Sequence, residues 1–145
     1  MSVNPSGQEL SAIDQWIYQT LTGDATLMAL IGGVHEHPAP QTMPFPIITY
    51  QDQGDFLDVP NTNAVQPIRV VSRGTYLVRV IGKEVPTSAL RPIAARIDQL
   101  LEGKHGATAL GTIAGCSRVR PYKFQEFTDG INYRHLGGMY RITVR

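Results

Sequence analysis

The chain has 145 residues, the size of one ordinary domain, so we expect a single domain over residues 1–145. Hydrophobic residues make up 42% of it and charged residues only 17%, below the about 25% typical of soluble domains. A low content of charged residues suits a protein whose surface is covered by partner molecules. The formal net charge of +1 argues against a free nucleic-acid-binding protein, because such proteins depend on a strongly basic surface.

Cysteine content and hydropathy indicate the compartment. Cys116 is the only cysteine, so no disulfide can form within the chain and a reducing environment is expected. The first residues have neither the basic nor the apolar region of a signal peptide. The longest apolar cluster, Leu27 to Ile31, is far shorter than the roughly 20 residues that span a bilayer. We therefore expect a soluble protein, made in a cytoplasm, with no membrane partner.

Charge is distributed unevenly along the chain. Residues 1–103 contain six basic and ten acidic side chains, whereas residues 104–145 contain seven basic and two acidic ones. One interpretation is that one edge of the fold is basic. The other is that copies pack head to tail, with the basic segment of one copy on the acidic segment of the next.

In chain order, the first predicted element is a helix. Ser6 and Glu9 have the spacing of a capping box, which satisfies otherwise unpaired amide groups at a helix start. Apolar residues then recur at steps of three or four, in Leu10, Ile13, Ile17 and Leu21, with Trp16 beside them. We expect this helix to end near Gly23, and Asp24 to cap a short apolar turn that stops at Gly32-Gly33.

Extended structure is predicted next. Val34 to His37 suits a short strand, and Ile47 to about Gln51 suits a second one. The four prolines between residues 38 and 46 favour an irregular surface connection between these strands. Residues 52–67 are acidic and rich in turn-forming residues, without a period of their own. Because they separate two strand-like runs, we predict that they form a protruding hairpin arm.

The middle of the chain predicts a second hairpin and a second helix. Two β-branched and aromatic runs, Ile68 to Ser72 and Thr75 to Ile81, are separated by Arg73-Gly74, which predicts a hairpin turn. Thr87 or Ser88 is expected to cap a helix that ends at Gly103. Its apolar stripe consists of Leu90, Ile93, Ala94, Ile97, Leu100 and Leu101.

The C-terminal part predicts a loop and two strands. Residues 104–115 suit a loop of small residues. Ser117 to Phe127, interrupted at Pro121, and Tyr133 to Val144 suit strands joined by an Asp129-Gly130 turn. The order of elements predicts an α+β fold. It would have a mostly antiparallel β-sheet, two main helices packed on one face and a protruding arm at about residues 52–67.

A search for catalytic motifs finds none. Neither a phosphate-binding glycine loop nor the nucleophile elbow of hydrolases is present. Nothing in the sequence identifies a base or an oxyanion donor for Cys116, so an inert packed thiol is expected. We therefore predict that the chain is not an enzyme, has no catalytic or metal-binding residues and uses no cofactor.

The residues alone leave two alternative functions open. His35 and His37 would project to the same side of a strand and could share an ion. A small metal-dependent or ligand-binding enzyme that uses them and Cys116 is therefore one alternative. The other is a single-stranded nucleic-acid-binding protein, because basic and aromatic residues are mixed between residues 118 and 127. Its candidate residues are Arg118, Arg120, Tyr122 and Phe124.

Several stretches give the chain a resemblance to a known family. They are residues 17–33 at the end of the first helix, Val34 to Gln41, Met43 to Tyr50, Thr75 to Gly82, Leu90 to Gly103 and Gly137 to Val144. In their order over nearly the whole chain, these stretches resemble the tail-terminator, or tail-completion, proteins of long-tailed bacteriophages and related gene-transfer particles.

The resemblance implies a structural virion protein. Such a protein would form a ring, expected to be hexameric, that caps the finished tail tube, stops its growth and joins the tail to the head. Its partners would be copies of itself, the tail tube protein and the head-tail connector or stopper protein, with DNA passing through the opening without sequence readout. It would be located at the tail or neck of the virion after assembly in the host cytoplasm. A head-closure or joining protein of the same neck is the nearest alternative.

The charge pattern and the resemblance together suggest the contact surfaces. We expect the acidic arm and the basic C-terminal strands to contact neighbouring subunits and partners. The candidate contact residues are Asp55, Phe56 and Asp58 in the arm, and Arg118, Arg120, Lys123, Arg134 and Arg141 in the strands.

Overall fold

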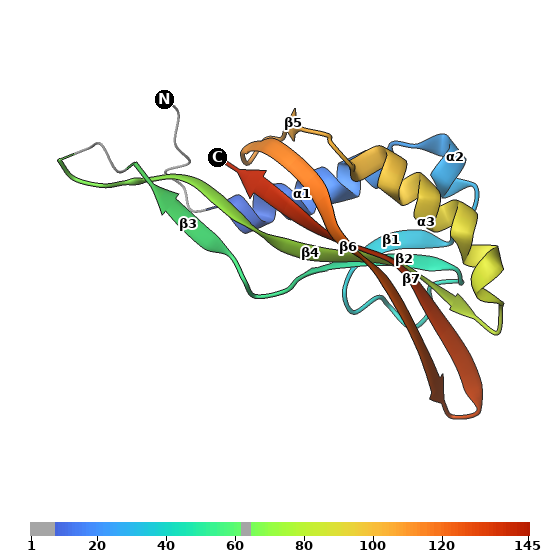
Figure 1. Ribbon diagram of the computed structural model, residues 1–145. Helices are drawn as coiled ribbons and strands as arrows, with labels where there is room; N and C mark the ends of the chain where they lie inside the picture. Colours follow the sequence, from blue (N-terminus) through green and yellow to red (C-terminus); the bar gives the residue numbers. More distant parts are fainter. Residues whose placement is uncertain (1–7, 62–64) are drawn as a thin grey trace.

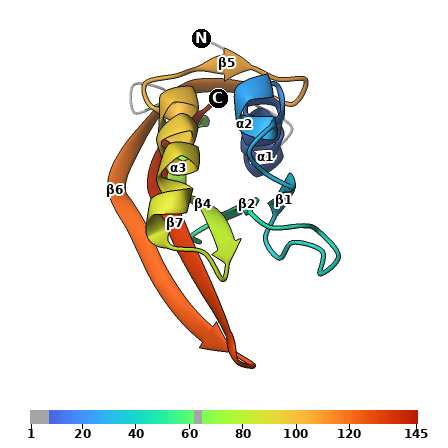
Figure 2. The same ribbon diagram turned by 90° about the vertical axis from the view of Figure 1, so that its right-hand side faces the viewer.

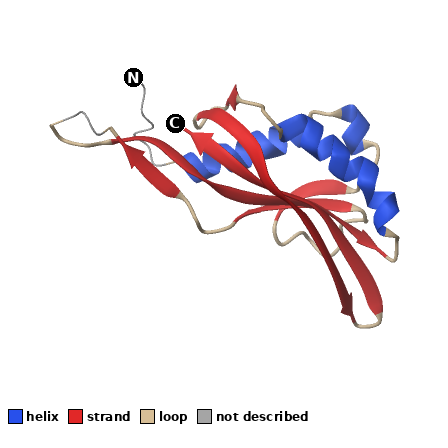
Figure 3. Ribbon diagram, in the orientation of Figure 1, coloured by secondary structure: helices blue, strands red, loops and turns tan. Residues whose placement is uncertain are grey.

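The computed structural model describes residues 8–61 and 65–145, which form helices packed on a curled β-sheet (Figures 1 and 3). The elements are α1 (Glu9–Thr22), α2 (Ala25–Met28), β1 (Gly33–Glu36), β2 (Ile47–Asp52), β3 (Leu57–Pro60), β4 (Arg69–Lys83), α3 (Thr87–Leu101), β5 (Gly106–Ala107), β6 (Thr112–Thr128) and β7 (Ile131–Val144). The strands lie in the order β1-β2-β4-β7-β6-β5, and β3 pairs with β4. Among the described strands, only β1 and β2 pair in parallel. The predicted α+β fold is confirmed.

Helices α1 and α3 lie side by side on one face of the sheet (Figure 2). Each turns an apolar stripe inward, as its residue spacing predicted. The buried hydrophobic residues of the two helices are Ala12, Ile13, Trp16, Ile17 and Leu21 in α1, and Leu90, Ile93, Ile97 and Leu101 in α3. Alternate residues of the two central strands complete this core from the sheet side, namely Tyr76, Val78 and Val80 in β4 and Tyr140, Ile142 and Val144 in β7.

Two buried tyrosines fix how the helices sit on the sheet. Tyr76 of β4 and Tyr140 of β7 are opposite each other in register, and each is 1% exposed. The Tyr76 hydroxyl donates to Asp14 of α1 at 2.8 Å, and the Tyr140 hydroxyl donates to Asp98 of α3 at 2.9 Å. Each helix therefore supplies one carboxylate to one tyrosine, so neither hydroxyl is buried without a partner.

Strand β7 passes very close to β4 at Gly137 and Gly138. A Cβ on Gly137 would clash with the Val78 carbonyl group and with the Arg79 Cα of β4, and one on Gly138 would meet the Arg118 side chain of β6. Position 137 therefore requires glycine, because backbone atoms of β4 would have to move, whereas at Gly138 only side chains, chiefly that of Arg118, would have to shift. The β6–β7 hairpin turns away from the helix layer, and its tip extends past the rest of the molecule (Figures 1 and 2).

The arm is a β3–β4 hairpin whose outer end extends beyond α1 (Figure 1). The predicted turn at Arg73-Gly74 is wrong, because β4 runs unbroken from Arg69 to Lys83. Gly74 lies directly against the Phe56 ring, where a Cβ would clash. The glycine thus marks a close approach within a strand and not a change of chain direction.

Two further expectations about strands are corrected. Residues 104–115 are not all loop, because β5 forms at Gly106–Ala107 and β6 begins at Thr112. Strand β6 is also not interrupted at Pro121. This proline pairs with Gly138 of β7 on one side, and its other side lies on an open sheet edge, where a missing N–H costs little.

The helix caps match the sequence in part. Asp24 caps α2 as predicted, because its carboxylate accepts a backbone N–H of that helix at 2.9 Å. Pro86, and neither Thr87 nor Ser88, is the cap residue of α3. The expected cap Ser6 lies outside the described residues, and α1 begins at Glu9.

A first prediction concerns the close approach of β7 to β4. Gly137→Ala should lower the free energy of unfolding by at least about 2 kcal/mol, because backbone atoms of β4 must move to admit the methyl group. Gly115→Ala in β6 is the matched control, since nothing lies within 4 Å of its Cβ position. Urea unfolding of both variants checks this, and equal losses would contradict it.

A second prediction concerns the carboxyl group under Tyr76. Burial raises the pKa of Asp14 to about 6, with the Tyr76 hydrogen bond opposing and Glu36 and Asp52 adding to the shift. A raised folded-state pKa stabilises the fold below the group's ordinary value, and this contribution is lost as pH rises through about 6.

Compared with Asp14→Asn, the wild-type chain should therefore lose stability between about pH 4 and about pH 7. Urea unfolding at several pH values measures the difference. Asp129→Asn, at an exposed turn, is the control and should keep the wild-type slope. A constant difference between wild type and Asp14→Asn across this range would refute the assignment.

Candidate functional site: assembly surfaces

In residues 8–61 and 65–145, Cys116 lacks the low pKa of a reactive thiol, and the histidines belong to no three-residue metal cluster. Cys116 is buried, and burial, with smaller effects of the Glu102 and Asp98 carboxylates, raises the pKa of its thiol to about 12. Such a thiol stays protonated and is a poor nucleophile. No three His, Cys, Asp or Glu side chains in this part of the chain are grouped so that they could hold a metal ion.

A buried arginine lies on the sheet face opposite the helices. Arg79 of β4 is 9% exposed. Its guanidinium donates to neutral oxygens of Thr49 at 3.3 Å, Gln51 at 3.5 Å and Tyr122 at 3.5 Å. The His37 Nδ1 lies 3.4 Å from the same group. A neighbouring guanidinium disfavours a second cation, so this contact argues against the metal site proposed for His37.

His135 of β7 links the two strands of the projecting hairpin. It is 6% exposed, and its Nε2 lies 2.8 Å from a carboxylate oxygen of Glu126 on β6. Burial lowers the pKa of His135; Arg79 and His37 add to this effect, and Glu126 opposes it. The ring is therefore neutral near neutral pH and acts through a hydrogen bond. Phe124 packs edge-on against it, with ring centres 5.4 Å apart.

Two of the predicted contact residues of the arm attach it to the sheet. Asp55 accepts the backbone N–H of Thr75 at 2.8 Å, and this hydrogen bond is the main reason why the pKa of Asp55 lies below its usual value. The Phe56 ring packs edge-on against Tyr76, with ring centres 5.8 Å apart. Asp55 and Phe56 therefore hold the base of the arm in place.

The outer part of the arm presents apolar side chains. Asp58, the third predicted residue, accepts the Ser72 hydroxyl at 2.5 Å and lies 4.0 Å from the Arg69 guanidinium. Large hydrophobic residues of the arm that are more than half exposed are Leu57, Val65 and Ile68. Residues 52–67 have no period of their own, so the sequence does not single out these side chains as exposed contact residues.

Arg118 lies on the helix side of the sheet, although it is exposed. Its backbone N–H donates to Glu102 at 2.6 Å, and its guanidinium lies 3.9 Å from Asp98 of α3. A basic residue of the C-terminal part thus pairs with an acidic residue of the first part within one copy, and not between copies. Because Tyr122 packs on Arg79 at the other face, the structure separates Arg118 from Tyr122. The nucleic-acid alternative needed these two side chains on one surface.

The other basic candidates are spread along the outer hairpin. Arg120 contacts the Met139 sulfur at 3.2 Å, and Arg134 contacts Gln125 at 3.4 Å. Lys123 is exposed. Arg141 and Asp55 line the same surface cavity. The positive charge of Arg141 contributes to the lowered pKa of Asp55. The five basic residues therefore do not form one patch, and their contact role stays a prediction.

The sheet has an open edge where another chain can add a strand. In the described chain, β6 pairs with β5 only at Thr112 and Ile113, and the Cys116 carbonyl and the Arg118 N–H are used by Gly103 and Glu102. The outer edge of β6 from Val119 to Thr128 has no strand partner. Unpaired edges of this kind are recognised sites of strand addition. Prolines blunt such edges, and Pro121 divides this one into two shorter parts.

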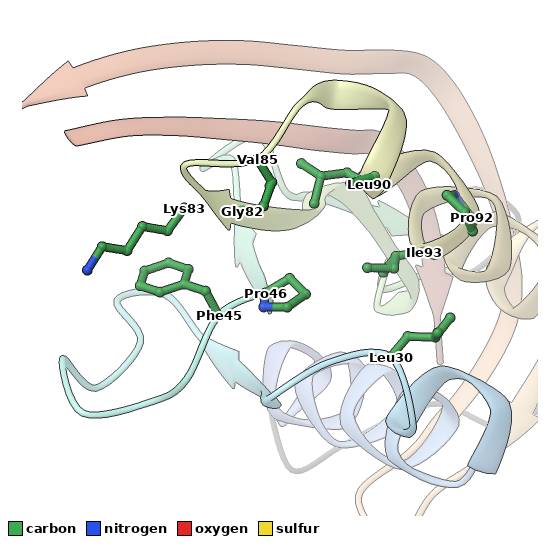
Figure 4. A pocket seen from close by; sticks show the side chains of 10 residues that line it. Leu30, Phe45, Pro46, Gly82, Lys83, Val85, Leu90, Pro92 and Ile93 are labelled. Carbon is green, nitrogen blue, oxygen red and sulfur yellow. The ribbon is translucent and has the colours of Figure 1, made fainter.

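An apolar pocket opens between the helix layer and the end of β4 (Figure 4). It has a volume of about 240 Å³. Its lining comes from four segments and consists of Leu30, Phe45, Pro46, Gly82, Lys83, Val85, Ala89, Leu90, Pro92 and Ile93. Leu30 and Phe45 are 44% and 37% exposed, so apolar surface continues from the pocket onto the surrounding surface.

Comparison with solved structures gives an informative likeness. No model of a known protein family matches the sequence, and no curated protein matches it. Among solved structures, a chain from the virion of a native gene transfer agent particle superposes with a TM-score of 0.72. The match covers 96% of this chain and 98% of that chain, at 18% sequence identity. The two chains share a fold.

The extent of this match is informative because neither chain has a large part that the other lacks. The superposition spans nearly all of both chains. None of the helices in the described residues combines the length and apolarity that a membrane span requires.

A third prediction concerns the attachment of the arm. Phe56→Ala removes the ring that packs against Gly74 and Tyr76, so protease cleavage within residues 53–68 should become about tenfold faster. Leu57→Ala is the control, since Leu57 is 54% exposed and should leave the cleavage rate unchanged. Limited proteolysis with mass spectrometry measures both rates. Equal rates would mean that Phe56 does not hold the arm.

Proposed function

We propose that this chain is a structural protein of a tailed virion or gene-transfer particle. The observation that carries the proposal is the whole-chain likeness to a chain of a gene transfer agent virion. The high pKa of the Cys116 thiol argues against its use as a nucleophile.

The specific role that we propose is tail termination. Copies of the chain form a ring, expected to be hexameric, on the end of the tail tube, where they stop tube growth and provide the surface for the head-tail connector. The particle is assembled in the host cytoplasm, and the chain stays at its tail or neck. The open edge of β6 and the projecting arm support this role, because both offer unpaired surface at the periphery of a compact body.

The candidate contact residues have two different roles: some hold the arm in place, and others contact partners. Asp55 and Phe56 set the direction of the arm, whose outer apolar side chains then reach a neighbouring subunit or the tube. Lys123 and Arg120 are exposed on the outer hairpin, and there they supply positive charge toward DNA or an acidic partner. DNA in the opening needs only backbone attraction and no base contacts.

A fourth prediction tests tail termination through the particle. Deletion of the gene should give tail tubes longer than those of the wild type and unjoined to heads, because nothing stops the addition of tube subunits. Electron microscopy of lysates measures tube length, and the gene supplied in trans should restore it. Tubes of normal length beside heads that have lost their DNA would instead favour head closure, and unchanged particles would contradict both roles.

A further inference from the structure

The apolar pocket at the end of β4 has the size and lining of a receptor for an aromatic side chain. A dry apolar cavity of about 150 Å³ is large enough to bind benzene, and this pocket measures about 240 Å³. In Figure 4 the Phe45 and Pro46 rings lie on one side of it, with Leu90 and Ile93 on the side of α3 and Leu30 across from them. Flat apolar walls of this kind suit a phenyl ring.

An exposed aromatic residue of matching size lies at the tip of the β6–β7 hairpin. Phe127 is 73% exposed, the largest exposed fraction of any aromatic side chain in the described residues. The turn beside it is tight, with positive φ angles of 53° at Asp129 and 76° at Gly130. The His135–Glu126 hydrogen bond ties the two strands together just before the tip. A ring presented on such a preorganised hairpin loses little freedom when it binds.

Phe127 does not reach the pocket of its own chain. It is held in the ladder opposite Asn132, whose backbone also exchanges hydrogen bonds with Glu84 at the end of β4. Entry into the pocket of the same copy would break these hydrogen bonds. A second copy needs no such change, because the tip extends past the body of the molecule (Figure 2).

Charge at the two surfaces is complementary. Lys83 stands at the pocket mouth, with its ammonium 5.9 Å from the Phe45 ring centre and no carboxylate within ion-pair distance in the described residues. Asp129, two residues after Phe127, likewise has no ion pair there. The exposed apolar residues of the arm offer no such match, because Asp58, the carboxylate that follows Leu57, is engaged by Ser72 and Arg69.

We propose that Phe127 of one copy inserts into the pocket formed by Leu30, Phe45, Val85, Leu90 and Ile93 of a second copy, with Asp129 approaching Lys83. Hairpin tip and pocket are different surfaces of one chain, so the contact is head to tail and can close a ring. The inference rests on the proposed function in so far as that ring caps a tail tube. The contact itself is a property of the purified chain.

A fifth prediction tests the contact by cross-linking. Two singly substituted chains, Phe127→Cys and Ala89→Cys, are mixed under mild oxidation, since Ala89 is an exposed residue of the pocket wall. A disulfide-linked pair that contains one chain of each kind is expected. The native Cys116 is 5% exposed, and each variant alone reports any background from it.

The same experiment tests the competing occupant of the pocket, which is the β3–β4 arm. Val65→Cys places a thiol on the fully exposed apolar residue of the hairpin arm. If Val65→Cys couples to Ala89→Cys and Phe127→Cys does not, the arm occupies the pocket and the proposal is wrong. Absence of both products at concentrations where the wild-type chain self-associates also overturns it.

The strength of the contact is tested by removing the ring. Phe127→Ser should weaken self-association at least about tenfold, because the pocket loses its apolar occupant, while the unfolding midpoint stays unchanged. Val65→Ser is the matched control and should associate like the wild type. Equal association of all three chains in sedimentation experiments would refute the contact.

These outcomes separate the contact from the proposed function. Normal tail termination by Phe127→Ser in complemented particles would refute the contact and leave the proposed function standing. Specific cross-linking of Phe127→Cys to Ala89→Cys, together with tubes of normal length after gene deletion, would support the contact and refute the function.

Discussion

The close packing of β7 against β4 at Gly137 is the constraint on which the outer face of the sheet and the outer hairpin depend. With no Cβ at this position, Arg79 of β4 and Tyr122 of β6 meet across the intervening strand on the face opposite the helices. Their contact covers a guanidinium that would otherwise be exposed on an open sheet. A larger residue would push β7 outward, and the outer hairpin would lose its direction.

The helix face depends on a different pair of contacts. Tyr76 and Tyr140 stand opposite each other in the two central strands, and each hydroxyl is matched by a carboxylate from one helix. Apolar packing alone would let α1 and α3 slide along the sheet, whereas two directed hydrogen bonds define their positions. These two contacts give the helix layer a defined position on the sheet from which both hairpins extend.

The sequence was sufficient for elements whose determinants are local. Helix spacing predicted the buried stripes of α1 and α3, and Asp129-Gly130 predicted the tight turn of the outer hairpin. It failed where a distant partner decides the structure. Gly74 resembles a turn residue until the Phe56 ring is placed on it, and Pro121 resembles a strand break until β6 is known to be at an edge. Exposed Phe127 and the pocket residues gave no local signal, because exposure and concavity arise only from the assembled fold.

The central claim is that this fold serves assembly in a virion, at the junction of tail and head. Cryo-electron microscopy of intact particles tests it most directly, because the density at the junction can be compared with the fold described here. The account predicts a ring of copies on the last layer of the tail tube, with the sheet and both hairpins recognisable. Particles whose junction contains no density of this shape, or purified particles that lack the chain altogether, would contradict it.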